Sequence, residues 1–294
     1  MLRGLYAASG DDFLAKIAVA GKTRSRILAQ GDGWTVSDVV CTSGPGDRPF
    51  EERHADFSIA IVAAGTFEYR SAAGRELMTP GSLMLGSAGQ SFECGHEHGV
   101  GDRCVAFWYA PAYFERLAAD AGARGTAPRL GGLRLPPLRA LSPLVARACA
   151  GIDGPVGAAW EEIGVRLAAQ AVQLSGGRPP RTDGAPPGAV ARVTAAVRRI
   201  ERDPEDALSL RSLACEARLS PYHFLRTFER ITGVTPHQYV LRVRLRRAAT
   251  ALATEPGKVL DVALDSGFGD LSNFNRAFRA EFGVSPRAYR RRAG

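Results

Sequence analysis

The sequence predicts a multidomain α+β protein, with short β-strands followed by helices, and three observations support this. From Trp34 to Tyr109, short runs of strand-forming residues alternate with glycine-containing turns. From Ala189 onward, a helical pattern repeats itself at an offset of 50 residues. Between them, Ser175–Gly188 carries four prolines and four glycines, which is typical of a linker. The chain has 294 residues, enough for two or three hydrophobic cores.

The β-rich part contains the string FSIAIVAAGTFEYRSAAGRELMTPGSLMLGSAG, in which each apolar run ends at a turn. This pattern predicts a small antiparallel β-barrel or jelly roll. Three helices are expected behind it, over Ala112–Ala123, Pro137–Ala150 and Ala158–Leu174. The last carries apolar residues on one stripe, so we expect it to pack against a core.

The repeat in the last third has the plan of two helix-turn-helix units. Each copy predicts a short helix, a tight turn and a second helix that begins at a capping residue. The short helices are expected at about Leu210–Ala217 and Lys258–Ser266, with Ser220 and Asp270 as caps. In the second copy, three phenylalanines recur at four-residue spacing and predict a buried stripe: Phe274, Phe278 and Phe282.

The positive charge of the chain lies in this same part. From Ala189 onward there are 19 Lys/Arg and 11 Asp/Glu, a difference that equals the net charge of +8 of the whole chain. A polyanionic partner would explain this, although a solvated charged face is the alternative. A connecting helix is expected over His237–Ala253, about 25 Å long. Its arginines are interpreted as phosphate contacts or solvated charges: Arg242, Arg244, Arg246 and Arg247.

The duplicated unit and the ending GFGDLSNFNRAFRAEFGVSPRAY resemble the C-terminal domain of the AraC/XylS family of bacterial transcription regulators, over about Ala189–Arg292. The resemblance implies a seven-helix domain that binds double-stranded promoter DNA, with RNA polymerase as a further partner. The DNA-contacting positions that it implies are Tyr222, Leu225, Arg226, Leu271, Ser272, Asn275 and Arg276. Arginine can donate two hydrogen bonds to guanine, and asparagine can do so to adenine.

The resemblance also implies a division of the chain. Residues 1–110 are expected to form a cupin-like sensor domain for an unknown effector, and residues 111–174 a helical dimerisation segment that makes a homodimer. A linker over residues 175–188 then leads to the DNA-binding domain at residues 189–294. The sequence has no stretch of about 20 apolar residues, so we expect a cytoplasmic protein.

The string FECGHEHGVGDRCVAFWY concentrates thiols and imidazoles. Cys94, His96 and His98 alternate as on one strand face, and Cys104 is expected to return opposite Cys94 in a hairpin. Such a set could hold zinc or another thiophilic metal, with His54 as a further ligand. A redox-responsive thiol pair, simple packing and contact with an organic effector are the alternatives.

A second function class is an enzyme, in the form of a metal-dependent cupin fused to a DNA-binding domain, and a third is a DNA-repair regulator that uses an acceptor cysteine such as Cys215. The metal site of the enzyme would need His96, His98 and a carboxylate from Glu93 or Glu97. Because Glu97 is expected on the opposite strand face from both histidines, the sequence favours a regulator without enzymatic activity. Cys215 lies in an apolar helix and is expected to pack in the core rather than react.

Overall fold

A computed structural model of the chain describes residues 23–49, 51–99, 101–122, 130–152, 159–175 and 186–293. Residues 176–185, most of the expected linker, lie outside this described part. The strands are β1 (Thr23–Gly31), β2 (Trp34–Cys41), β3 (Glu51–Arg53), β4 (Phe57–Gly65), β5 (Phe67–Ser71), β6 (Gly74–Met78), β7 (Leu83–Gly86), β8 (Ser91–Gly95), β9 (Asp102–Tyr109) and β10 (Arg134–Leu135). The helices of the first half are α2 (Pro111–Asp120), α3 (Ser142–Ile152) and α4 (Trp160–Ser175), with a short 3₁₀ turn at Arg139–Leu141.

The strands form two antiparallel sheets that pack face to face. One has six strands in the order β1-β2-β9-β4-β7-β10, and the other has four in the order β3-β8-β5-β6. Successive residues of a strand point to opposite faces. Thus Ala60 and Val62 of β4 pack in the cluster between the sheets, whereas Ile59 and Ile61 pack in the cluster on the outer face.

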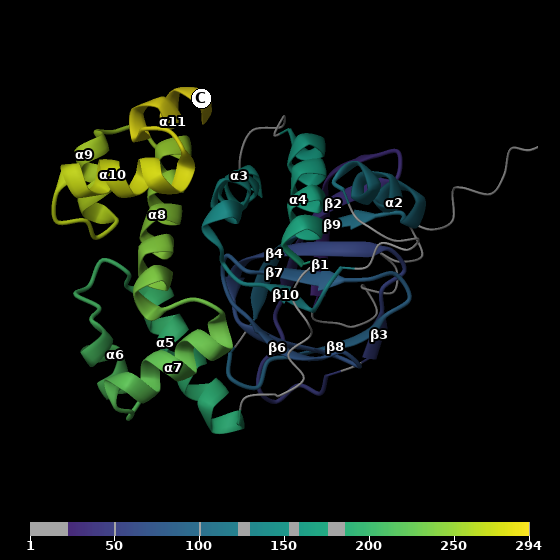
Figure 1. Ribbon diagram of the computed structural model, residues 1–294, viewed down its shortest axis with the longest axis horizontal. Helices are drawn as coiled ribbons and strands as arrows, with labels where there is room; N and C mark the ends of the chain where they lie inside the picture. Colours follow the sequence, from purple (N-terminus) through teal and green to yellow (C-terminus); the bar gives the residue numbers. More distant parts are fainter. Residues whose placement is uncertain are drawn as a thin grey trace, which may run out of the picture.

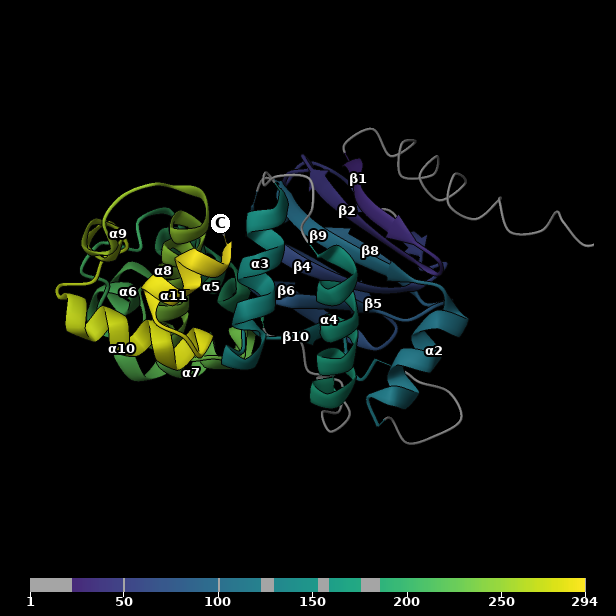
Figure 2. The ribbon, with the colours of Figure 1, turned by 90° about the horizontal axis from the view of Figure 1, so that it is seen from above.

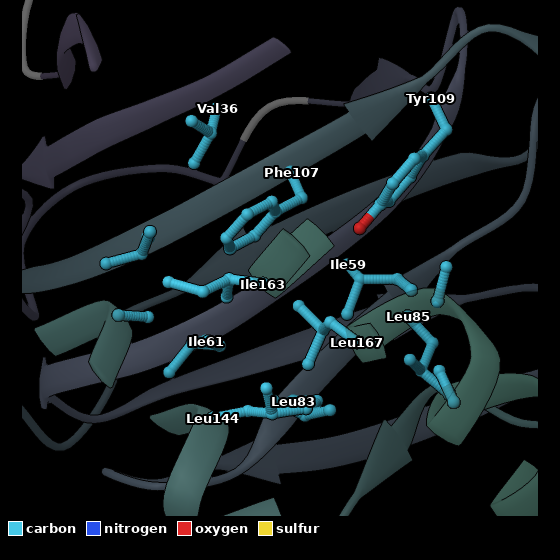
Figure 3. Packing of buried hydrophobic residues seen from close by; sticks show 14 of the residues in the cluster. Val36, Ile59, Ile61, Leu83, Leu85, Phe107, Tyr109, Leu144, Ile163 and Leu167 are labelled. Carbon is cyan, nitrogen blue, oxygen red and sulfur yellow. The ribbon is translucent and has the colours of Figure 1, made fainter. Parts of the chain in front are cut away.

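Helices α2, α3 and α4 cover that outer face of the six-stranded sheet (Figure 2). Figure 3 shows Leu144 of α3 and Ile163 and Leu167 of α4 against the strand residues Ile61 and Phe107. The amphipathic stripe expected on α4 is therefore its buried face. Helices from residues 111–120, 142–152 and 160–175 agree with the sequence expectation to within a few residues at each end.

The C-terminal part is helical and consists of two similar units joined by one long helix (Figure 1). Its helices are α5 (Pro187–Arg202), α6 (Leu210–Glu216), α7 (Pro221–Thr232), α8 (Pro236–Thr254), α9 (Val259–Asp265), α10 (Leu271–Phe282) and α11 (Pro286–Ala293). The pairs α6–α7 and α9–α10 lie at opposite ends of α8 (Figure 1). Phe274 and Phe278 are fully buried, as the stripe predicts, and Phe282 packs beside them.

The second helix of each pair begins at the capping residue that its sequence predicts. Ser220 accepts a hydrogen bond from the backbone of His223, and Asp270 accepts one from Asn273 at 2.7 Å. Gly233 and Gly283 end the helices with φ of 81° and 74°, a left-handed conformation that glycine adopts without strain. The two units therefore have the same local construction.

Replacing the cap Asp270 by alanine should lower the free energy of unfolding by about 1 kcal/mol, because Asn273 would lose the acceptor of its N–H group. Urea unfolding of the full-length protein measures the change. Lys258, at the N-cap of α9, makes no capping hydrogen bond, so Lys258→Ala is a matched control that should change stability little. Equal losses in the two variants would contradict this account of the cap.

Two features of the first half differ from expectation. Residues Thr23–Gly31 form an additional strand, β1, at the edge of the larger sheet. The expected hairpin between β8 and β9 is wrong, since β8 belongs to the four-stranded sheet and β9 to the six-stranded sheet. The chain thus crosses from one sheet to the other between these strands. Among the described residues, no helix combines the length and apolar character needed to cross a membrane.

Candidate functional site

The second helices of the two pairs, α7 and α10, present the expected DNA-contacting side chains to solvent. Tyr222 is 66% exposed and Leu271 is 36% exposed, which is unusual for such large apolar groups. The four polar positions are also exposed: Arg226, Ser272, Asn275 and Arg276. Leu225 is half-buried. The phenylalanines of the same helices point into the cores, so each helix has one buried and one free face.

The arginines of α8 do not form part of this free face. Arg244 donates hydrogen bonds to the carbonyl groups of Pro204 and Asp206, and Arg246 forms a two-fold ion pair with Glu201 at 2.8 and 2.9 Å. Arg242 lies 3.5 Å from Glu281, and Arg247 donates to backbone carbonyls at the end of α5. These contacts brace α8 against its neighbours, so the side chains are not simply solvated charges, although Arg247 is also exposed. Phosphate contact by these arginines stays a prediction.

A cavity of about 140 Å³ lies between the two sheets of the first half. Its wall is largely apolar and aromatic, with Phe67, Phe92 and Trp108. Its polar side chains include those of His54, Cys94, His96, Cys104 and two residues that the sequence analysis did not select, Cys41 and Asp102. Enclosed apolar pockets with a few convergent polar groups are typical of small-molecule sites.

The structure divides the predicted Cys/His set. Cys94 on β8 and Cys104 on β9 belong to different sheets and both line the cavity. His96 follows the end of β8 and also lines it, whereas His98 lies in the next turn and groups with Glu68 and Glu97. Because the two histidines lie in separate groups, the 2-His-1-carboxylate site required by the enzyme hypothesis is not assembled.

Within the described part of the chain, two groups of three side chains could bring metal-ligating atoms together. One is Cys41, His96 and Asp102, and the other is Glu68, Glu97 and His98. Neither group contains Cys94 or Cys104, so the four-ligand zinc set on one hairpin is not formed. His54 is instead buried in a hydrogen bond of 2.7 Å to Tyr69 and stacks on Phe92.

The helical part of the chain is similar to known regulators. The family model described as "Helix-turn-helix domain" matches residues 213–292. The Transposon Tn10 TetD protein of Escherichia coli is 35% identical over 92 residues, which are 31% of this chain and 67% of that protein. The HTH-type transcriptional regulator MtrA of Neisseria gonorrhoeae is 33% identical over 98 residues, 33% of each chain. The chain belongs to the AraC/XylS family of transcription regulators.

The sequence matches to these curated regulators lie in this part. The match spans about a third of the length of the first curated relatives, for example 33% of MtrA and 36% of the probable transcriptional regulator LumQ of Photobacterium leiognathi. Among solved structures, an AraC-type DNA-binding domain-containing protein from Chromobacterium violaceum is 28% identical, with a TM-score of 0.34, and the alignment covers 36% of this chain and 96% of that one.

In the N-terminal part of this AraC-type chain, Cys41, His96 and Asp102 form a compact group in the cavity wall. The Nε2 atom of His96 lies 2.6 Å from Oδ2 of Asp102, and the ligating atoms of all three residues lie within 4.8 Å of one another. Burial disfavours a charged imidazole, but the hydrogen bonds and charge interactions with Asp102 and Cys41 together outweigh it and raise the pKa of His96 to about 9. His96 is therefore a cation at neutral pH, held between a carboxylate and a thiol.

The three thiols of the cavity have different acidities. Burial alone would raise the pKa of Cys41, but hydrogen bonds from His96 and Ser43 outweigh it and lower that pKa below its usual value. Burial raises the pKa of Cys94 and of Cys104 well above the usual value. Cys41 thus has the most anionic character of the three. The sequence offered no local signal for it, because its partners follow 55 and 61 residues later.

Cys215 also differs from expectation, since it is exposed on α6 rather than packed in the core. Only Leu213 and Ala214 of that helix are buried, because α6 is short and rests on α7 along one side.

Proposed function

We propose that the protein is a sequence-specific DNA-binding transcription regulator that responds to a signal received by its N-terminal part. The observation that carries the proposal is the pair of helix-turn-helix units, each with a buried aromatic face and an exposed polar face on its second helix. Membership of the AraC/XylS family supports the same function.

The spacing of the two units fits double-stranded DNA. Helix α8 has 19 residues and is about 28 Å long. Successive major grooves on one side of B-DNA repeat at about 34 Å. Helices α7 and α10, at the ends of α8, would enter neighbouring major grooves. There, in this proposal, Arg226 and Arg276 contact guanine edges, and Asn275 contacts adenine.

The N-terminal part supplies the sensor in this proposal. Its two facing sheets form a cupin-like unit whose cavity, with His54, Cys94, His96 and Cys104 in the wall, contacts the effector. Residues 111–174 act as the dimerisation segment of a homodimer. The regulator works on promoter DNA in the cytoplasm, where RNA polymerase is its further partner.

The test uses the full-length protein and a pool of random-sequence duplexes, from which bound sequences are selected. Selection should converge on one sequence, and affinity should fall with rising salt because bound arginines release counterions from phosphates. Failure of the pool to converge, with no salt-dependent binding to any duplex, would exclude this function.

Replacing Arg276 by alanine should weaken binding to the selected sequence by roughly 1–3 kcal/mol and relax the preference at one base position. Arg276 is exposed on α10, and its guanidinium donates to Asn273 at 3.2 Å, which orients it along the helix surface. The control is Arg291→Ala on α11, which should weaken binding to all sequences about equally. Uniform losses in both variants would show that Arg276 contacts phosphate rather than a base.

A further inference from the structure

We infer that the N-terminal cavity is a covalent binding site for a small conjugated carbonyl compound, with Cys41 as its nucleophile and His96 as its proton donor. The inference deepens the proposed function, since it rests on a sensor role of this domain and names the chemical class of the signal.

The cavity has the size and lining for such a ligand. A cavity of roughly 150 Å³ with apolar walls holds a benzene-sized ring, and this one measures about 140 Å³. Aromatic side chains on both sheets line it, among them Phe92 on β8 and Trp108 on β9. A flat conjugated ring of this size therefore suits the space between the aromatic side chains of the two sheets.

Cys41 lies beside an exposed border of the cavity. It is half-buried at the end of β2, and the lining residues that follow it in sequence include the exposed Arg48 and Pro49. Cys104 is buried, and Cys94 is half-buried like Cys41. Of the three thiols, only that of Cys41 belongs to the group with the His96 imidazole and the Asp102 carboxylate.

The neighbours of Cys41 form the arrangement that activates a nucleophile. A thiol beside a base that a third group orients is the general pattern of covalent catalysis. Here the imidazole of His96 faces Cys41, and its Nε2 is fixed at 2.6 Å from the Asp102 carboxylate. Asp102 also accepts a hydrogen bond from the Cys104 thiol at 3.4 Å, which holds the carboxylate in place.

The reaction balances without a further reagent. The Cys41 thiolate forms a C–S bond to the β-carbon of an α,β-unsaturated carbonyl compound, and the π electrons move to the carbonyl oxygen as an enolate. The His96 imidazolium gives its proton to this enolate, whose ketone form is restored with the proton on the α-carbon. The products are a thioether on Cys41 and a neutral His96 that keeps its contact with Asp102.

The test treats the full-length protein with 2-cyclohexen-1-one and follows the intact mass and the modified peptides. We expect one added probe, located on Cys41, and no such addition in Cys41→Ser. Exposed Cys215 is an internal comparison, and Cys41 should react at least about tenfold faster, because the His96 imidazole, held by Asp102, lies beside its sulfur atom. His96→Gln keeps the Cys41 thiol but should slow its reaction to about the rate of Cys215.

Three results would overturn the inference. The first is labelling of Cys215 as fast as Cys41. The second is a stoichiometric metal ion in freshly purified protein that protects Cys41 until a chelator removes it. The third is a faster reaction with hydrogen peroxide, seen as a disulfide to Cys94 or Cys104, which would mark an oxidant sensor. DNA binding of the unmodified protein is measured on the same sample. Loss of DNA binding would count against the proposed regulator function, whereas Cys41 labelling alone decides the covalent-site inference.

Discussion

Replacing Arg134 by alanine is expected to destabilise the protein by about 3–5 kcal/mol, because it breaks a buried ion pair. The Arg134 side chain is 3% exposed and lies 3.0 Å from the Glu76 carboxylate. Its guanidinium also donates to the carbonyl groups of Ile231 and Thr232 at 2.8 and 2.9 Å, at the end of α7. One side chain of the sheet domain thus caps a helix of the C-terminal helical part. Its truncation removes the cationic partner of Glu76 and the hydrogen-bond donor of both carbonyl groups.

Urea unfolding, followed by far-UV circular dichroism, measures the change. Arg75→Ala is the matched control. Arg75 pairs with Glu68 at 3.3 Å and its side chain is 36% exposed, so this variant should lose less than about 1 kcal/mol of unfolding free energy. A loss in Arg134→Ala no larger than in the control would mean that the two domains do not pack in this way in solution. Arg134 pairs in register with Met84 of β7, which lines the cavity. A movement of β7 would therefore displace Arg134 and its hydrogen bonds to the end of α7.

A pair of glycines gives an independent check on the same contact. Gly233 and Gly283 end equivalent helices with nearly the same φ, so alanine should cost each about 1 kcal/mol in backbone strain. A Cβ atom on Gly233 would lie 2.7 Å from the Pro136 Cβ atom of the sheet domain, whereas one on Gly283 meets nothing within 4 Å. Gly233→Ala should therefore cost more, and equal costs would argue against the domain contact.

The helical half was predictable because its signals are local. Caps such as Asp270, the terminal Gly283 and the four-residue spacing of Phe274 and Phe278 each depend on neighbours within one helix turn. The repeat then doubles the evidence, since two independent copies predict the same unit. Exposure of Arg276 follows directly, because the buried stripe leaves only the opposite face free.

The sheet half was less predictable because its contacts are distant in sequence. A short glycine-containing stretch between two strands usually indicates a hairpin, yet Cys94 pairs in register with Tyr69 and Cys104 with Val39 and Val62. No local rule selects these partners. Cys41 was missed for the same reason, since it meets His96 only when β2 and the end of β8, which belong to different sheets, come together at the cavity.

Charge patterning misled in a related way. The arginines of α8 looked free because the sequence shows their number but not their partners. Glu201 accepts from Arg246, which follows it by 45 residues, and the carbonyl group of Pro204 accepts from Arg244, which follows it by 40 residues. Basic residues on a helix are thus evidence of DNA binding only after their intramolecular partners are known.

Replacing Phe278 by alanine is expected to cost about 3–5 kcal/mol of unfolding free energy, as for other large core aromatics. Phe278 is fully buried, and its ring centroid lies 4.5–5.4 Å from those of Phe274, Phe282 and Tyr289. These rings hold α10 against α11, so the cavity left by the substitution would loosen the helix that carries Arg276. DNA affinity should fall together with stability, as measured by urea unfolding and by titration of the selected duplex.

Tyr222→Ala separates folding from DNA contact. Tyr222 is an aromatic residue at 66% exposure on α7, so its truncation should change stability by no more than about 0.5 kcal/mol while weakening DNA binding. Phe228→Ala, in the equivalent core position of α7, should behave like Phe278→Ala because Phe228 is also fully buried. If Phe278→Ala unfolded like the wild type and still lost DNA affinity, Phe278 would have to act at the DNA surface and the burial of the aromatic stripe would be refuted.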